Sequence, residues 1–204
     1  MSENKDPLSE IVQFLNLDSR LDLKIIALDH VVGLSASREG VEALLKNGVI
    51  LTKIIDLLDD KNNDIAKNAT VLLVNVTASE SGAKDVLKYK PSDHKDVLEL
   101  LISVVMNPQK VNADAACMML SNVTRLEDEL DACIDVILPH LNDIINIFVN
   151  TDFNKKGCKL HYLAPMLSNL SRSKTTMYAR VKPRAKTVYN INYRVVEPFL
   201  LFCE

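Results

Sequence analysis

A repeated segment constrains this chain more than any other feature. Four segments share one pattern: a small or apolar residue, three or four residues, Leu or Val, any residue, one fixed position, Val or Leu, and Thr or Ser. The segments are 26–37, 68–79, 115–125 and 160–172. Their fixed position is occupied by Gly33, Asn75, Asn122 and Asn169, which lie 42, 47 and 47 residues apart. A period of about 40–47 residues is typical of armadillo and HEAT arrays.

An amphipathic segment precedes each copy of the motif. Apolar residues recur there at helical spacing, and a polar, turn-forming stretch follows, so each unit is expected to be helix, short loop, helix. The expected unit limits are 8–40, 41–82, 91–127 and 134–172. Only 5 Gly and 7 Pro in 204 residues also favour long helices over hairpins. We therefore predict an all-α, armadillo/HEAT-type right-handed superhelical solenoid of about four repeats, stacked around a continuous core.

Charge divides the chain into two parts. Residues 172–204 hold seven of the 24 Lys and Arg residues but only two of the 27 Asp and Glu residues. The predicted domains are a solenoid over 1–171 and a divergent basic tail over 172–204, either disordered or folded onto the acidic body. Residues 187–196 in this tail alternate like a strand. An acidic body does not suit nucleic acid, because neutralising phosphates requires a basic face.

The four cysteines, the N-terminus and the hydropathy indicate a cellular setting. The cysteines are far apart and form no C-x-x-C pair, so buried or free thiols in a reducing compartment are expected rather than a zinc site. The polar N-terminus has no apolar core of a secretory signal. No apolar run approaches the ~20 residues that span a bilayer. We expect no membrane partner and a cytoplasmic location, and nothing in the sequence excludes the nucleus.

No residue pattern indicates catalysis. The chain has no Gly-rich phosphate loop, no H-E-x-x-H and no G-x-S-x-G. The four histidines are dispersed, and His30 and His161 are expected at the edge of the core or in a groove rather than as ligands. We predict a protein that is not an enzyme and that needs no cofactor or metal.

The asparagines of the repeat are the candidate binding residues. Asn is a poor residue within a helix, so its recurrence at Asn75, Asn122 and Asn169 suggests a common role. One interpretation is a row of amides along a groove that binds an extended peptide backbone. The other is that each Asn bonds to a neighbouring helix end within the stack. Arg125 and Arg172 each lie three residues after an Asn and are expected to contact an acidic client.

Two further patterns have simple interpretations. The Asn-x-Ser/Thr sequences match the glycosylation acceptor, but they lie inside predicted helices and are interpreted as by-products of the repeat. The acidic stretch 127–135 is interpreted as the solvated start of a helix, where carboxylates are favourable, and an acidic docking patch is the alternative.

Residues 48–77 resemble the armadillo repeat in general, including the Asn that lines the groove of peptide-binding members. This resemblance implies a scaffold or a peptide-binding transport adaptor. Importers of basic peptides usually carry Trp beside the groove Asn, and this chain has no Trp, so import is disfavoured.

A closer resemblance is to the brain-protein-16-like family of armadillo-type proteins. It rests on residues 25–36, 113–125 and, most specifically, 161–171, and it covers roughly 8–171. The resemblance implies an adaptor that assists folding of translation elongation factor 2, with the cytosolic chaperonin and heat-shock co-chaperones as partners. After Ser171 the chain departs from the family, which suggests a truncated isoform or a gene-model artefact.

Overall fold

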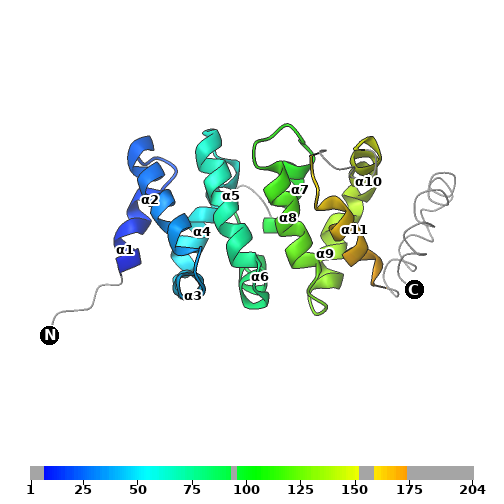
Figure 1. Cartoon of the computed structure of the whole chain (residues 1–204), viewed down its shortest axis with the longest axis horizontal. Helices are drawn as coiled ribbons and strands as arrows, with labels where there is room; N and C mark the ends of the chain where they lie inside the picture. Colours follow the sequence, from blue (N-terminus) through cyan, green and yellow to red (C-terminus); the bar gives the residue numbers. More distant parts are fainter. Residues whose placement is uncertain (1–6, 93–95, 152–158, 174–204) are drawn as a thin grey trace.

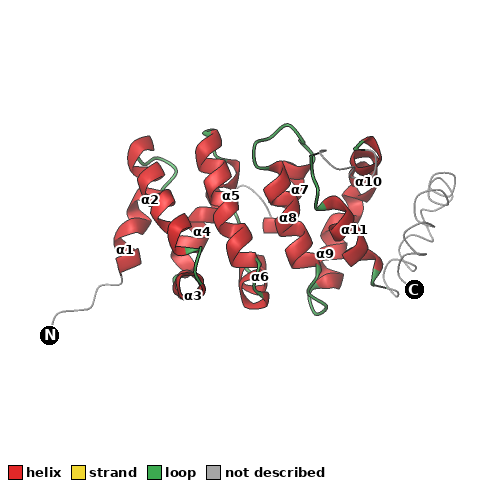
Figure 2. Ribbon diagram, viewed as in Figure 1, coloured by secondary structure: helices red, strands yellow, loops and turns green. Residues whose placement is uncertain are grey.

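The computed structural model describes residues 7–92, 96–151 and 159–173, and within these ranges all regular structure is helical. Figure 1 shows the helices as a row of stacked units, and Figure 2 shows helices joined by loops with no strand among the described residues. The prediction of an all-helical repeat fold is confirmed.

Eleven α-helices are described, and they fall into four units. The first unit has two helices and the other three have three each. The helices are α1 (Pro7–Val12), α2 (Leu21–Leu34), α3 (Arg38–Lys46), α4 (Gly48–Asp56), α5 (Asn63–Thr77), α6 (Glu80–Leu87), α7 (Val97–Val105), α8 (Ala113–Thr124), α9 (Leu130–Ile137), α10 (Leu141–Asn150) and α11 (Leu163–Ser171). Short 3-10 turns extend α1, α4 and α9, at Gln13–Leu15, Leu57–Asp59 and Leu138–His140.

A short additional helix (α3, α6 or α9) precedes the helix pair in each of the last three units, and the predicted unit limits missed it. The predicted boundary at 40/41 falls inside α3, and the boundary at 82 falls inside α6. Ser37 and Ser79 cap these two helices by accepting from the backbone N–H of Gly40 and Gly82. A Cβ at Gly82 would lie 2.0 Å from the carbonyl oxygen of Val76, so only glycine permits this tight corner.

The last helix of each unit, α2, α5, α8 or α11, packs against the last helix of the next unit, and together these four helices form one side of the stack (Figure 1). They are called the third helices below, although the first unit has only two. A buried alanine occurs at the same position of three of them, at Ala27, Ala69 and Ala116. Its small side chain allows neighbouring helices to approach closely. The core then continues from unit to unit without interruption, as expected for a repeat stack.

Buried polar side chains also join successive units. Lys24 of α2 is 5% exposed, donates to the Leu17 carbonyl oxygen at 2.8 Å and pairs with the Asp60 carboxylate at 3.4 Å. Asn112 is 3% exposed and donates to the Leu58 carbonyl oxygen at 2.8 Å and to the Thr70 hydroxyl at 3.0 Å. No described buried side-chain nitrogen or oxygen lacks a hydrogen-bond partner.

One stretch departs from the expectation that no segment could span a membrane. Leu130–Asn150 is 21 residues long with a mean hydropathy of 1.5, so by length and composition alone it could cross a membrane. In the structure it is α9, a 3-10 turn containing Pro139, and α10. Helix α9 packs against α7 and α8, and α10 packs against α11, so this stretch is part of the helical stack. Core helices of soluble proteins meet the same criterion, which makes it weak evidence for a membrane span.

The predicted boundary between solenoid and tail stays a prediction. Helix α11 ends at Ser171 and the description ends at Ser173. The strand-like alternation at 187–196 and two of the cysteines, Cys158 and Cys203, lie outside the described residues.

Candidate functional site

The candidate residues lie on the exposed side of the third helices, here called the α2–α5–α8–α11 face. The repeat places Gly33, Asn75, Asn122 and Asn169 at one equivalent position near the C-terminal end of each helix. The next residue in the last three units is fully or almost fully buried: Val76, Val123 and Leu170. The asparagines are therefore at the border between the core and the solvent, and each is half-buried.

Each asparagine bonds backwards to the preceding third helix. Asn75 Nδ2 donates to the Ser35 hydroxyl at 2.9 Å, and Asn122 Nδ2 donates to the Thr77 hydroxyl at 3.2 Å. Asn169 Nδ2 donates to the Thr124 hydroxyl at 3.2 Å and to the Ser121 carbonyl oxygen at 3.0 Å. The acceptor hydroxyls lie two residues after the fixed position of the preceding unit, so the repeat supplies both halves of the bond.

The hydroxyl protons determine which way the amides point. Ser35, Thr77 and Thr124 donate to carbonyl oxygens of their own helices, at 2.7, 3.2 and 2.7 Å respectively. A hydroxyl has one proton, so toward the asparagine it acts as an acceptor, and the amide nitrogen faces it. The three carboxamide oxygens accept no hydrogen bond from the described residues. They remain available on the α2–α5–α8–α11 face as acceptors.

The two arginines also contact the preceding unit. Arg125 Nη2 donates to the carbonyl oxygen of Ala78, which follows the last residue of α5. Arg172 Nη2 donates to the carbonyl oxygens of Thr124 and Arg125, at 3.4 and 2.9 Å, at the end of α8. A cation at a helix C-terminus is favourable because the unpaired carbonyls there carry partial negative charge. Both side chains are exposed, so the remaining guanidinium N–H groups face solvent.

The two ends of this row differ from its middle. Gly33 has no third helix before it, and a Cβ placed there would meet nothing within 4 Å. At the other end Ser171 occupies the acceptor position, and its hydroxyl donates to the Ser168 carbonyl oxygen at 2.7 Å. The first unit thus has glycine where the later units have the hydrogen-bonding asparagine. The last described unit still has a hydroxyl at the position that accepts such a bond.

An apolar band crosses the same face beside the asparagines. It consists of Ile26, Val71, Met118, Tyr162 and Pro165, at two neighbouring positions of the repeat. Ile26 is 66% exposed, Val71 36% and Tyr162 37%, while Met118 is half-buried and Pro165 exposed. Exposed apolar side chains that recur on one face of a stack are typical of a protein-binding site.

Two pairs of polar side chains lie next to residues of the apolar band. Asn68 Nδ2 donates to the Asp29 carboxylate at 2.7 Å, between α5 and α2. His161 Nδ1 lies 3.9 Å from the Asp114 carboxylate, which also accepts from the backbone N–H of Leu160. His30, the other histidine singled out in the sequence, is exposed on α2. Both histidines are exposed, and neither belongs to a metal-binding cluster among the described residues.

The described residues offer no centre for metal chemistry. No group of three or more His, Cys, Asp or Glu residues among them is arranged to hold a metal ion. Cys117 and Cys133 are free and buried, and burial raises the pKa of both thiols, that of Cys133 to about 12. A thiol with a raised pKa is a poor nucleophile. That the protein is not an enzyme stays a prediction.

Sequence reasoning missed the hydroxyl row and the apolar band. The signal for the hydroxyls was the Asn-x-Ser/Thr pattern itself, which was set aside as a by-product of the repeat. The pattern reflects a hydrogen bond between units. The Asn amide donates to the hydroxyl of the preceding unit, and the Ser or Thr hydroxyl accepts from the Asn of the next unit. The band could have been found by aligning Val71, Met118 and Pro165, which occupy one position in three units.

Comparison with known proteins gives three kinds of similarity. A family model described as a domain of unknown function (DUF383) matches residues 104–200. Proteins named "Protein HGH1 homolog" are similar over most of the chain. The one from Drosophila pseudoobscura pseudoobscura is 38% identical over 173 residues, which cover 81% of this chain and 46% of the relative. Those from Drosophila melanogaster and Danio rerio are 37% and 33% identical, over 82% and 83% of this chain and 47% and 44% of their own lengths.

A solved structure supports the fold alone. An engineered protein (Northeast Structural Genomics Consortium target OR497) has a TM-score of 0.62 at 14% identity, and the match covers 80% of this chain and 37% of that protein.

These similarities concern the predicted domain boundary and the homology of the chain. The family match extends past residue 171 into the segment that the sequence analysis separated from the solenoid. The chain spans slightly less than half the length of these three curated relatives. The proteins named HGH1 homolog, at 26–38% identity, are homologues of this chain.

Proposed function

We propose that this chain is a non-catalytic protein-binding adaptor that holds an extended or partly folded client on the α2–α5–α8–α11 face. The observation that carries the proposal is the apolar band, because Ile26, Val71 and Tyr162 are all exposed at repeated positions of one face, and grouped exposed apolar residues are typical of interaction sites. The outward carboxamide oxygens of Asn75, Asn122 and Asn169 accept from a client backbone whatever its sequence. Arg125 and Arg172 add a cationic edge that favours acidic segments.

The client that we propose is translation elongation factor 2, which the chain assists in folding together with the cytosolic chaperonin and heat-shock co-chaperones. Similarity to proteins named HGH1 homolog, and the resemblance of residues 161–171 to the brain-protein-16-like family, support this choice. Such work takes place in the cytoplasm. A general armadillo-type scaffold or peptide-binding transport adaptor is the second candidate, and it is favoured by the sequence-independent amide acceptors.

Capture from eukaryotic cytosol followed by mass spectrometry tests this proposal. Asn75, Asn122 and Asn169 changed together to Ala would also remove three bonds between units, so this variant alone cannot separate binding from folding. The sharper variant combines Ile26→Asp with Tyr162→Asp, since both side chains are exposed. Its matched control is Val49→Asp, because Val49 of α4 is 58% exposed and lies outside the proposed face.

The expected result is enrichment of elongation factor 2 and chaperonin subunits by the natural chain and by Val49→Asp, and loss with Ile26→Asp/Tyr162→Asp. Enrichment that survives in this variant would contradict the proposed face. Enrichment of many unrelated proteins with extended segments, without elongation factor 2, would favour the general scaffold.

A further inference from the structure

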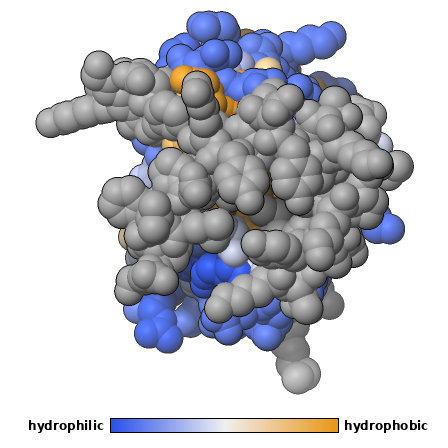
Figure 3. All heavy atoms as spheres, turned by 90° about the vertical axis from the view of Figure 1, so that its right-hand side faces the viewer, coloured by the Kyte–Doolittle hydropathy of each residue, from blue (hydrophilic) through white to orange (hydrophobic). Residues whose placement is uncertain are grey.

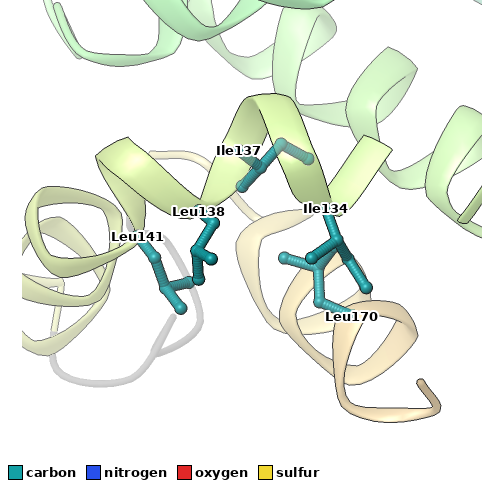
Figure 4. A pocket seen from close by; sticks show the side chains of 5 residues that line it. All are labelled: Ile134, Ile137, Leu138, Leu141 and Leu170. Carbon is teal, nitrogen blue, oxygen red and sulfur yellow. The ribbon is translucent and has the colours of Figure 1, made fainter. Parts of the chain in front are cut away.

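The last described unit ends in a surface that no described repeat covers, here called the end face. It comprises a shallow apolar pocket on α9, α11 and the turn between α9 and α10, lined by Ile134, Ile137, Leu138, Leu141 and Leu170. Figure 4 shows Leu138, Leu141 and Leu170 on the side of α9 away from the green helices of the preceding unit. Figure 3 views this end of the stack, where apolar and hydrophilic surface of the described residues lie next to each other.

The unit that bears the end face is strongly acidic. From residue 126 to 151 there is no Lys or Arg, and the acidic residues there are Glu127, Asp128, Glu129, Asp131, Asp135 and Asp143. One of them is paired with the preceding unit, because Lys84 Nζ lies 3.1 Å from the Asp128 carboxylate. Glu127, just before α9, and Asp131 and Asp135, within it, are exposed. This apolar pocket beside acidic residues suits a segment that is both basic and apolar.

The chain that follows has this composition. From residue 174 to 196 there is no Asp or Glu, and the basic residues there are Lys174, Arg180, Lys182, Arg184, Lys186 and Arg194. Apolar residues lie at its end and beyond it, at Val195–Val196 and Phe199–Phe202, and Glu197 and Pro198 separate these two groups. The number of basic residues in 174–196 equals the number of acidic residues in 126–151.

The last described residues already direct the chain toward α9. The Ser173 hydroxyl donates to the Asp131 carboxylate at 3.0 Å, and Arg172 holds the end of α8. Leu170, which lines the pocket, lies only four residues before the segment that begins at 174. A segment tethered this closely has a high effective concentration at the end face, in the millimolar range for a short flexible link. The family match to 104–200 also runs through this unit and most of the segment that follows.

We propose that residues 174–204 dock onto the end face of the same chain. The basic residues pair with the carboxylates of α9, and the apolar residues cover the pocket lined by Leu138, Leu141 and Leu170. This docking closes the stack at its C-terminal end, where an uncovered unit would expose apolar surface. It assigns the end face to the chain itself and leaves the α2–α5–α8–α11 face for other proteins.

Carbodiimide cross-linking of the full chain tests the docking. The reagent joins a carboxylate to a lysine amine only when the two are in contact, and equal amounts of ¹⁵N-labelled and unlabelled chain distinguish links within a chain from links between chains. The informative lysines are Lys182 and Lys186, because Lys174 lies next to the described contact of Ser173. Hydrogen exchange of the segment is followed in parallel for the natural chain, for Asp131→Lys/Asp135→Lys and for the control Asp18→Lys, an exposed position at the other end of the stack.

We expect links within one chain from Lys182 or Lys186 to Glu127, Asp131 or Asp135. We also expect amide exchange in 174–204 to be slowed at least about tenfold relative to an unstructured peptide, and this protection to be lost with Asp131→Lys/Asp135→Lys but kept with Asp18→Lys. Links found only between labelled and unlabelled chains would overturn the proposal in favour of a second copy. Unprotected amides without links from these lysines would overturn it in favour of an open end face that another protein covers.

Discussion

The interior of the stack and its C-terminal end are built from the same repeat but meet different surroundings. Between α5 and α8 each part of the motif has its counterpart: Asn122 bonds to Thr77, Arg125 to the end of α5, and Val123 is buried. At the end formed by α9 and α11, Ser171 and the apolar pocket have no further described repeat against them. The difference shows that the motif encodes contact with a neighbour more than it encodes the helix itself. The predictions below compare matched positions in the two regions.

Removing a leucine should affect the interior far more than the end. Leu120 of α8 is fully buried, so Leu120→Ala is expected to lower the free energy of unfolding by about 3–5 kcal/mol, through lost burial and the cavity left behind. Leu138 lines the end face and is only half-buried, so Leu138→Ala is expected to lower it by about 1 kcal/mol. Urea denaturation followed by circular dichroism measures both. Equal losses would mean that the end is packed as tightly as the interior.

Two glycines should respond to alanine with opposite signs. At Gly82 a Cβ would lie 2.0 Å from the Val76 carbonyl oxygen, so Gly82→Ala should destabilise the protein by about 2 kcal/mol or more because the backbone must move. At Gly33 the Cβ meets nothing and the residue is within α2, so Gly33→Ala should stabilise it by about 0.5–1 kcal/mol. Thermal unfolding of the two variants decides this. A destabilised Gly33→Ala would show that something covers the start of the row.

The two buried thiols give the interior and the end a common pH dependence. Burial raises the pKa of Cys117 in α8 and that of Cys133 in α9, the latter to about 12, above the ordinary thiol value of 9.0. A pKa raised by folding contributes stability that is complete below the unfolded pKa and is lost as the pH rises toward the folded pKa. The free energy of unfolding should therefore fall above about pH 9, by up to ~1.4 kcal/mol per pH unit and thiol.

Urea titrations at pH 8 and pH 10 measure this fall. Cys133→Ala should reduce the slope with pH to about half, and an unchanged slope would mean that other groups cause it. At pH 8, peptide-resolved thiol labelling should modify Cys133 before Cys117, because the end unit has a neighbour on fewer sides and opens more readily.

A single bond of the asparagine row should have a small effect. Asn122→Ala removes the bond to Thr77 and is expected to lower the free energy of unfolding by about 1 kcal/mol. Gly33→Asn restores the repeat consensus where no preceding third helix exists, so it should gain no inter-repeat bond. A double-mutant cycle of Asn122→Ala with Thr77→Val isolates the bond, and a coupling energy near zero would show that the asparagines are not held by the stack.

The sequence predicted the repeat architecture well because its period is carried by many residues. Four copies of one pattern, each with an apolar helix before it, leave few alternatives to a helical stack. The short helices α3, α6 and α9 were missed because they have only eight or nine residues, and their start depends on Ser37 and Ser79 caps and on the close approach at Gly40 and Gly82. Local contacts of this kind do not show in hydrophobic periodicity.

The candidate site was predictable by position but not by geometry. Periodicity placed Asn75, Asn122 and Asn169 together, yet it could not tell whether an amide bonds to a neighbour or to a client. The structure shows why both interpretations apply to one side chain: the nitrogen bonds to the preceding unit, and the oxygen accepts nothing from the described residues. Whether these asparagines and Arg125 and Arg172 bind a partner stays a prediction.

The most direct test of client binding on the α2–α5–α8–α11 face is the affinity of purified chain for urea-unfolded elongation factor 2 diluted into buffer, measured by fluorescence anisotropy. Val71→Asp puts a charge at the centre of the apolar band, and Val49→Asp puts the same charge on α4. We expect Val71→Asp to weaken binding by about tenfold or more, since placing a charge in an apolar contact costs more than ~1.4 kcal/mol, and Val49→Asp to leave it unchanged. Equal affinities for both variants and the natural chain would contradict the assignment of the face.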